Sequence, residues 1–314
     1  MKKWIVWLLG LAILTFLSIY IFIPSKIVIS KVIAAVVPTS AEFRYVSQQD
    51  KWEKWWRDAH GKSHSPGEPF TYNGTTFRLS QTGYNVAGID IEQDGIILHS
   101  ELDLVSISKD STWTRWNCQI LAGNHPIARL RQYQRAVEIS KNMKAVLDNL
   151  KLFVSNPKNV YEIAIFRTSF RDTSMLSTRF TSTSYPTTEE TYQHFDALRK
   201  SIQKQKAQIT GYPMMSVSML KTGSFETQVA VPTNRTLQNE GAIFYRKMVP
   251  GNFLCAVVKG GRYSIDESMR QLEFFLKDNG KIQMARPFEQ LITDRISEPD
   301  TAKWITRIYL PVAE

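Results

Sequence analysis

The sequence has little cysteine and lacks the short glycine-rich motifs of nucleotide and nucleophile sites. Its two cysteines, Cys118 and Cys255, exclude a disulfide-rich scaffold and a four-cysteine zinc site in a chain of 314 residues. Each cysteine falls in an apolar stretch, which favours two buried free thiols over a bridge or a nucleophile. No GxSxG, P-loop or Rossmann glycine pattern is present, so no familiar motif points to a reaction or a cofactor.

A concentrated run of basic residues is also missing. The net charge is +10, but residues 27–156 carry 15 basic and 13 acidic residues, and residues 157–314 carry 21 and 16. Because the excess is spread thin, we expect no nucleic-acid partner. A composition of 43% hydrophobic and 22% charged residues is that of a globular protein, and the length suggests two domains.

One long apolar run stands near the start of the chain. Residues 4–23 contain no charge, and a helix of twenty residues spans about 30 Å, the thickness of the hydrocarbon core. Bulky Tyr20 and Phe22 stand where a cleaved signal peptide would need small residues, and Pro24 ends the run. The pattern predicts an uncleaved, single-pass anchor over residues 1–26.

The flanking charges give a weak orientation. Lys2 and Lys3 favour an N-terminus on the cytoplasmic side, although Lys26, Lys31 and Arg44 on the other flank reduce the difference. We therefore expect a protein of the cytoplasmic membrane whose N-terminus lies inside and whose remaining chain lies outside.

The region after the anchor alternates between short elements. Residues 26–36 are typical of a strand, and residues 39–45 of a short helix. Residues 69–121 read as an antiparallel meander, and residues 127–153 as one long amphipathic helix. Turn signals divide the meander at Asn73-Gly74, Asp94-Gly95 and Lys109-Asp110.

This element order, together with a tryptophan-rich segment, resembles the START-like, or SRPBCC, superfamily of polyketide cyclases and lipid-transfer proteins. The resemblance covers residues 27–156 and implies a helix-grip fold around an apolar cavity for a hydrophobic ligand. Trp52, Trp55 and Trp56 lie at i, i+3 and i+4 on one helical face. They form either an aromatic core face or the wall of a ligand pocket, and the sequence leaves both open.

Residues 157–314 repeat one pattern twice. A strand within 159–170 and a strand over 175–184 precede a helix that runs from Thr187 to about Ile209, with a capping box formed by Thr187 and Glu190. Two strands follow. The second pass begins with a strand over 253–259 and a helix that we expect to be capped by Ser264, and it also ends in two strands. The pattern predicts a duplicated βαββ unit, so the overall fold class is α+β.

The duplicated half, and above all its ending PFEQLITDRISEPDTAKWITRIYLPV, resembles the GyrI-like effector-binding domain of BmrR-type activators. That family forms a small-molecule cleft between two βαββ repeats, and some members bind cationic amphiphiles through a strand glutamate. Glu289 matches that position. The resemblance implies that an acid in an aromatic pocket attracts a cation, although Glu289 on an exposed edge strand is the plainer alternative. The candidate lining residues are Tyr192, Phe195, Tyr245 and Tyr263.

A metal site is the weakest candidate in the sequence. His60 and His64 have the i, i+4 spacing of zinc ligands, but the glycine, serine and proline residues around them predict a loop. We expect no metal and no cofactor.

Three functions are compatible with these observations. The leading hypothesis is a membrane-anchored, non-catalytic binding protein for a small hydrophobic or amphipathic ligand, cationic ligands included. The second is an enzyme, of the cyclase or hydrolase type, that acts on a hydrophobic small molecule in one of the two pockets. The third is an interaction protein, because one type of GyrI-like protein binds a topoisomerase.

Deletion of residues 1–25 should leave a folded protein in aqueous buffer, because both predicted domains have complete sets of elements downstream and no second apolar run. Circular dichroism should show cooperative melting, and size-exclusion chromatography should show a discrete species. Aggregation without cooperative melting would place the domain boundary elsewhere.

Overall fold

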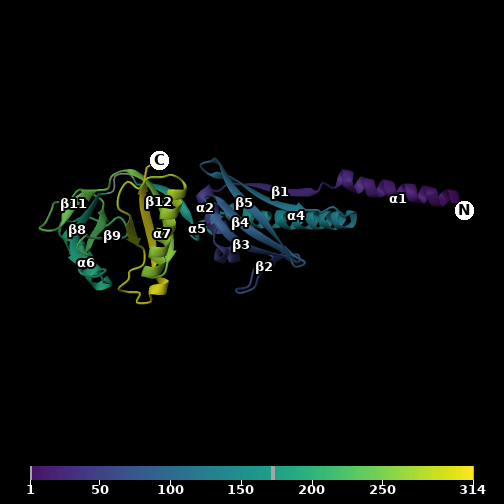
Figure 1. Ribbon diagram of the computed structural model, residues 1–314. Helices are drawn as coiled ribbons and strands as arrows, with labels where there is room; N and C mark the ends of the chain where they lie inside the picture. Colours follow the sequence, from purple (N-terminus) through teal and green to yellow (C-terminus); the bar gives the residue numbers. More distant parts are fainter. Residues whose placement is uncertain (1, 171–173, 314) are drawn as a thin grey trace. The chain divides into compact units, whose positions relative to one another are not determined.

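The structure, a computed structural model, describes residues 2–170 and 174–313 (Figure 1). Internal contacts divide the chain into two compact units, Met1–Asn156, here called unit 1, and Pro157–Glu314, called unit 2. Each unit combines helices with one antiparallel sheet, so the fold is mixed α+β.

Unit 1 is a curled meander with one long helix at its C-terminal end. Its sheet has the strand order β1-β6-β5-β4-β3-β2. The strands are β1 (Lys26–Ala35), β2 (Phe70–Tyr72), β3 (Thr75–Gly83), β4 (Val86–Gln93), β5 (Ile96–Ser108) and β6 (Ser111–Leu121). The helices are α1 (Lys2–Phe22), α2 (Thr39–Val46), α3 (Trp52–Trp55) and α4 (Pro126–Val154). The strands and helices therefore follow the order that the sequence predicts.

Two tight turns explain why the meander forms. Asn73 and Gly74 have φ values of 45° and 75°, and Asp94 and Gly95 have 51° and 72°. Two-residue hairpins of type I′ need positive φ at both central residues, which Asn-Gly and Asp-Gly adopt readily. The hairpin predictions at these two positions are confirmed by the β2–β3 and β4–β5 pairings.

Tryptophan side chains fill the centre of unit 1. Trp52 and Trp56 stack with their ring centres 5.6 Å apart, and Trp55 and Trp116 are buried beside the same core. The space left between these side chains and α4 is only about 10 Å³, which is about the volume that one water molecule requires. The apolar cavity expected for this half of the chain is therefore closed by aromatic packing.

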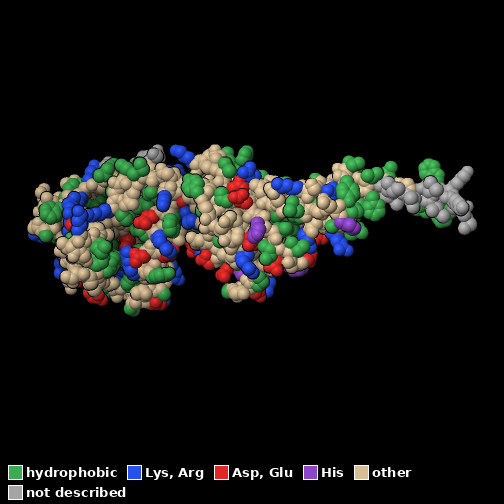
Figure 2. Space-filling view, in the orientation of Figure 1, with side chains coloured by type: hydrophobic (Ala, Val, Ile, Leu, Met, Phe, Trp, Pro, Cys, Tyr) green, Lys and Arg blue, Asp and Glu red, His purple; other side chains and the backbone are tan. Residues whose placement is uncertain are grey.

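Helix α1 continues from the folded part of unit 1. The hydroxyl of Tyr20 donates a hydrogen bond to the carbonyl oxygen of Asn124 at 2.7 Å, and the guanidinium of Arg129 lies 4.6 Å from the centre of the Tyr20 ring. Many of its described apolar side chains are exposed (Figure 2). Within residues 2–170 and 174–313, no helix combines the length and hydropathy of a membrane-spanning segment.

Unit 2 contains one sheet of eight strands in the order β11-β8-β10-β9-β13-β14-β12-β7. The strands are β7 (Ile165–Phe170), β8 (Ser174–Ser182), β9 (Met214–Met219), β10 (Phe225–Thr233), β11 (Phe244–Lys247), β12 (Gly251–Lys259), β13 (Phe288–Leu291) and β14 (Ile305–Val312). The helices are α5 (Pro157–Tyr161), α6 (Thr188–Lys204) and α7 (Arg262–Asp278). β11 is a strand that the sequence pattern did not indicate.

The topology contains the predicted βαββ unit twice. β8-α6-β9-β10 and β12-α7-β13-β14 follow the same order, and β9 pairs with β13 where the two copies meet. The copies also share a detail of their last strands. Thr210 donates its N–H to the carbonyl oxygen of Pro232 at 3.1 Å, and Met284 donates to Pro311 at 3.0 Å. The same contact at the same place in both copies supports duplication.

The predicted helix boundaries are partly wrong. The capping box at Thr187 is present, since its side chain accepts from the Glu190 N–H at 3.1 Å. Ser264, in contrast, lies inside α7, which begins at Arg262 with Gly261 as its N-cap. Gly260 has a φ of 131°, and this glycine geometry turns the chain from β12 into α7 before Ser264 is reached.

Two further boundaries differ from the prediction. Val160 and Tyr161 belong to α5, and the following strand begins at Ile165 because Glu162 adopts a φ of 60°. Helix α6 ends at Lys204 instead of continuing to residue 209, because Lys206 adopts a φ of 52° and the Ala207 N–H bonds back to the carbonyl oxygen of Ile202.

One carboxyl group lies in the core of unit 1. Glu42 on α2 is fully buried, and its Oε1 accepts a hydrogen bond from the Thr114 hydroxyl at 2.5 Å. Its Oε2 has no hydrogen-bond partner among the described residues. Burial raises the pKa of Glu42 to about 7, although the Thr114 hydrogen bond opposes this shift.

Glu42 should make the stability of unit 1 fall as pH rises from about 4.5 to about 7, since the folded state holds the proton more tightly than the unfolded state. The loss is at most about 3 kcal/mol, at about 1.4 kcal/mol per pKa unit. Glu42→Gln should remove this dependence, so the stability of the variant relative to the parent should rise between pH 5 and pH 8.

Urea unfolding followed by tryptophan fluorescence tests this, because seven of the eight tryptophans lie in unit 1. Parallel pH profiles for the parent and Glu42→Gln would show that Glu42 does not titrate in this range.

Candidate functional site

Glu289 lies on the middle strand pair of unit 2, close to where the two copies join. Strand β13 pairs Glu289 with Met215 of β9 on one side and with Ile308 of β14 on the other. Its side chain points to the same face as Leu291, which packs with the residues of α6. Only 6% of Glu289 is exposed, so it is a buried acid and not an exposed edge-strand residue.

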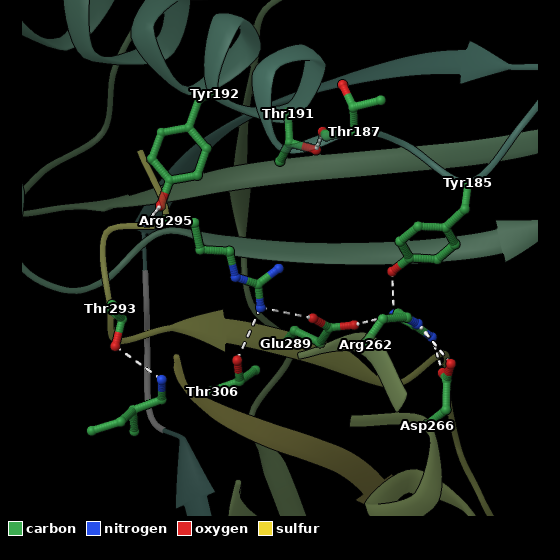
Figure 3. Close-up of polar contacts among 11 residues, drawn as sticks. Tyr185, Thr187, Thr191, Tyr192, Arg262, Asp266, Glu289, Thr293, Arg295 and Thr306 are labelled. Carbon is green, nitrogen blue, oxygen red and sulfur yellow. Dashed lines mark hydrogen bonds and ion pairs between the residues drawn. The ribbon is translucent and has the colours of Figure 1, made fainter. Parts of the chain in front are cut away.

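Arg262, the first residue of α7, reaches one oxygen of this carboxylate. Its Nη1 lies 2.9 Å from Oε1 of Glu289, and its guanidinium lies 4.2 Å from the centre of the Tyr185 ring (Figure 3). Asp266, one helical turn later, accepts from Nε of Arg262 at 2.9 Å. The Glu289 carboxylate and the face of the Tyr185 ring thus both stabilise the positive charge of Arg262.

Arg295 reaches the other oxygen of Glu289. Its Nη2 lies 3.4 Å from Oε2 and donates a hydrogen bond to the Thr306 hydroxyl at 2.9 Å. The guanidinium also lies 4.6 Å from the centre of the Trp304 ring. Figure 3 shows Glu289 between the two guanidinium groups. The arginines differ in burial, because the side chain of Arg295 is 10% exposed and that of Arg262 is 43% exposed.

The charged side chains of this cluster are two acids and two arginines. Glu289 and Asp266 balance the charges of Arg262 and Arg295, and the most buried members are Glu289 and Arg295. Burial, together with the negative charge of Glu289, raises the pKa of Tyr185. Tyr185 therefore stays protonated at neutral pH and can act as a hydrogen-bond donor or acceptor, but not as an anion. Of the two arginines, Arg262 is the one that a solute can reach more easily.

The predicted lining residues are dispersed. Tyr192 is buried and its hydroxyl accepts the N–H of Arg295 at 2.7 Å, so it supports the cluster from α6. Phe195 is fully buried and packs against Tyr192 in the core. Tyr245 lies on β11, where its hydroxyl is 3.0 Å from that of Ser174. Tyr263 is 83% exposed and contributes nothing to this cluster.

The predicted residues of unit 1 lie in another environment. Trp52, Trp55 and Trp56 donate their indole N–H groups to the backbone carbonyls of Val46, Tyr45 and Thr71, respectively. With these bonds and the stacking described above, they are core residues around a space too small for an organic ligand.

Sequence reasoning missed the arginines and Tyr185. Arg262 and Asp266 have the i, i+4 spacing of an ordinary helical ion pair, so their pattern indicates nothing special. Arg295 begins the segment Arg295-Ile296-Ser297, where the sequence departs from the short turn typical of the GyrI-like ending that it resembles, and this departure is the one signal in the sequence. Tyr185 gives none, because the fold alone brings it to Arg262.

The remaining candidate reactive side chains in the sequence are two cysteines and two histidines. Burial raises the pKa of the Cys118 thiol to about 11 and that of Cys255 to about 12. His60 and His64 lie outside helices, and no group of three or more possible ligands is gathered among the residues that the structure describes.

Comparisons with known proteins give only distant likenesses. No protein-family model matches the sequence, and no curated protein matches it. Among solved structures, the C-terminal domain of EcmrR is 18% identical with a TM-score of 0.43, over 48% of this chain and 98% of that domain. A hydrolase from Listeria innocua is 11% identical with a TM-score of 0.39, over 48% and 91%.

A structure of SAV2435 bound to tetraphenylphosphonium is 12% identical with a TM-score of 0.31, over 48% of this chain and 94% of that one. Because all three TM-scores are below 0.5, none of these likenesses carries weight in assigning a function.

Glu289→Ala should lower the stability of unit 2 by about 3 kcal/mol, because it leaves Arg295 buried without its carboxylate. Calorimetric unfolding measures the change. Glu240→Ala is the matched control, since Glu240 pairs with exposed Lys204 and its loss should matter much less. Equal effects of the two substitutions would mean that the Glu289 cluster is not energetically buried.

Proposed function

We propose that unit 2 is a GyrI-like binding module for a small amphipathic molecule with a positively charged group, and that Glu289 receives that group. One observation carries the proposal: the site already holds a cation. The guanidinium of Arg262 occupies a position 2.9 Å from the Glu289 carboxylate and 4.2 Å from the centre of the Tyr185 ring. Aromatic faces and carboxylates are what proteins use to bind organic cations.

Arg262 acts in this proposal as an occupant that the ligand replaces. Its side chain is partly exposed and keeps Asp266 as a second partner when it leaves Glu289. Arg295 is largely buried and bonded to Thr306, so it remains in place and orients the carboxylate. A ligand cation therefore competes with one arginine and not with two.

The attraction is large enough to measure. Two unit charges 4 Å apart interact by about 4 kcal/mol at an effective dielectric of about 20. Desolvation of both charges and displacement of Arg262 oppose this gain, so we expect a preference of about 1–3 kcal/mol for a cation over a neutral analogue.

We further propose that unit 1 is a START-like domain whose own pocket is closed, so that ligand binding belongs to unit 2. Support comes from the element order of unit 1 and from the tryptophan packing that leaves about 10 Å³. We also propose that residues 4–23 anchor the chain in the cytoplasmic membrane with the N-terminus inside. The anchor proposal rests on twenty uncharged residues in the sequence and on exposed apolar side chains along α1.

Glu289→Gln should weaken the binding of tetraphenylphosphonium at least tenfold, which corresponds to about 1.4 kcal/mol, and should leave triphenylphosphine oxide nearly unchanged. Arg262→Gln should have the opposite effect and strengthen cation binding, because the internal competitor is gone. Equilibrium dialysis with the purified full chain measures both, and comparison between variants cancels non-specific partitioning.

The matched control is Arg270→Gln, on the same helix but paired with Glu267. It should leave both affinities unchanged. Equal loss for the cation and the neutral compound in Glu289→Gln would make Glu289 a structural residue, and weaker cation binding in Arg262→Gln would refute displacement.

A further inference from the structure

The last turn of α1 is fastened to unit 1 at the point where α4 begins. In addition to the contacts of Tyr20, Nη1 of Arg129 donates a hydrogen bond to the carbonyl oxygen of Ile23 at 3.0 Å. The Ala122 N–H donates to the carbonyl oxygen of Ser25 at 2.9 Å. Figure 1 shows the end of α1 beside the first turns of α4. These bonds determine which surface of unit 1 lies next to α1.

That surface combines strand ends with the start of α4. Lys26, the first residue of β1, pairs with Leu121, the last residue of β6, and Ile96 begins β5 at the same end of the sheet. A hollow of about 440 Å³ at this end is lined by Ile96 and by Ile127 and Arg131 of α4. Residues 26, 96–97, 121 and 125–135 therefore form one surface, here called the proximal surface.

Apolar side chains of the proximal surface are in contact with water. Leu121 is 76% exposed and Ile127 is 52% exposed, and Ile97 and Leu130 are exposed as well. Side chains of this kind normally pack inside a folded domain. Their gathering at one end of unit 1 indicates a surface that contacts an apolar partner.

The charge of the proximal surface is mainly positive. Residues 126–137 contain three arginines and no acid. Arg135 pairs with Asp94 at 3.3 Å, and Arg129 donates to backbone carbonyl oxygens. Arg131 is exposed and, within the part of the chain that the structure describes, it has no acidic partner. Exposed Lys26 adds a further positive charge, so the surface attracts anions.

The proposed anchor determines what lies beside this surface. With residues 4–23 in the bilayer, Tyr20 lies near the end of the span, where tyrosine side chains commonly meet the lipid headgroups. Its hydroxyl is only 2.7 Å from the carbonyl oxygen of Asn124, two residues before α4 begins. The proximal surface is therefore held at the depth of the headgroups, whatever the direction in which the rest of the chain extends.

We infer that the proximal surface binds the headgroup layer of a membrane that contains anionic phospholipid. Ile127 and Leu121 enter the boundary between headgroups and acyl chains, and Arg131 and Lys26 face the lipid phosphates. The inference rests on the proposed anchor, and it adds a second membrane contact with a preference for negatively charged lipid.

Fluorescence quenching of the full chain in vesicles tests this contact. A fluorophore is coupled to Ile127→Cys or, as the matched control, to Ile107→Cys, since Ile107 is 50% exposed near the other end of β5. The native cysteines are buried and stay unlabelled. In vesicles of equal parts phosphatidylglycerol and phosphatidylcholine, nitroxides on the headgroups should quench residue 127 at least threefold more than residue 107. Equal quenching at the two positions would overturn the inference.

Lipid charge gives the second readout. In vesicles of phosphatidylcholine alone, the excess quenching at residue 127 should fall at least twofold, because the phosphate groups no longer carry a net negative lipid charge to the arginines. Arg131→Gln should have the same effect in the mixed vesicles. Lys141→Gln, which removes an exposed charge about 15 Å further along α4, should not. Equal quenching in both lipids, or equal effects of the two substitutions, would refute recognition of anionic lipid.

A third label separates this inference from the anchor on which it rests. A fluorophore on Leu14→Cys, in the middle of α1, should be quenched by nitroxides placed deep in the acyl chains. Quenching at residue 14 without excess quenching at residue 127 would overturn the proximal contact and leave the anchor intact. Absence of quenching at residue 14 would overturn the anchor, and the proximal contact with it.

Discussion

The pairing of β9 with β13 is the constraint on which unit 2 depends. Only Glu289–Met215 and Gln290–Met214 pair across this junction, yet they join two four-strand sets into one sheet. The register at this junction determines which side chains of β13 face the helices. A shift by one residue would exchange Glu289 with its neighbours and place an unpaired acid against Phe253 and Tyr309. The acid cluster on one face, and the cluster of Phe253, Phe288 and Tyr309 on the other, are thus two results of one register.

The burial of Glu289 explains the arrangement of its neighbours. A carboxylate removed from water requires strong partners, and Arg262 and Arg295 supply them from opposite sides. A purely structural ion cluster is seldom better than apolar packing of the same volume. The partial exposure of Arg262 distinguishes this cluster from a fully buried one.

The sequence predicts those features whose interactions join residues that are close together in the chain. The Thr187 capping box was predictable because both of its hydrogen bonds lie within four residues. The same pattern at Ser264 misled, because the glycine geometry at Gly260 started the helix earlier. The partners of Glu289 were out of reach, since Arg262 lies 27 positions away and only the folded sheet brings it close. The helical spacing of the tryptophans fitted both a core and a pocket, and packing alone decided between them.

The prolines near the ends of β10 and β14 affect how this sheet can associate. Pro311 accepts from Met284 on the side where β13 has already ended, and it has no N–H to offer there. An incoming extended peptide needs free donors and acceptors, and here the acceptor is already used by residues 282–284, which run beside the end of β14. Pro232 closes the equivalent place in the first copy. The ends of β10 and β14 are therefore already covered by the chain's own backbone, and the strands of this sheet that remain open to strand addition are the outer ones, β11 and β7.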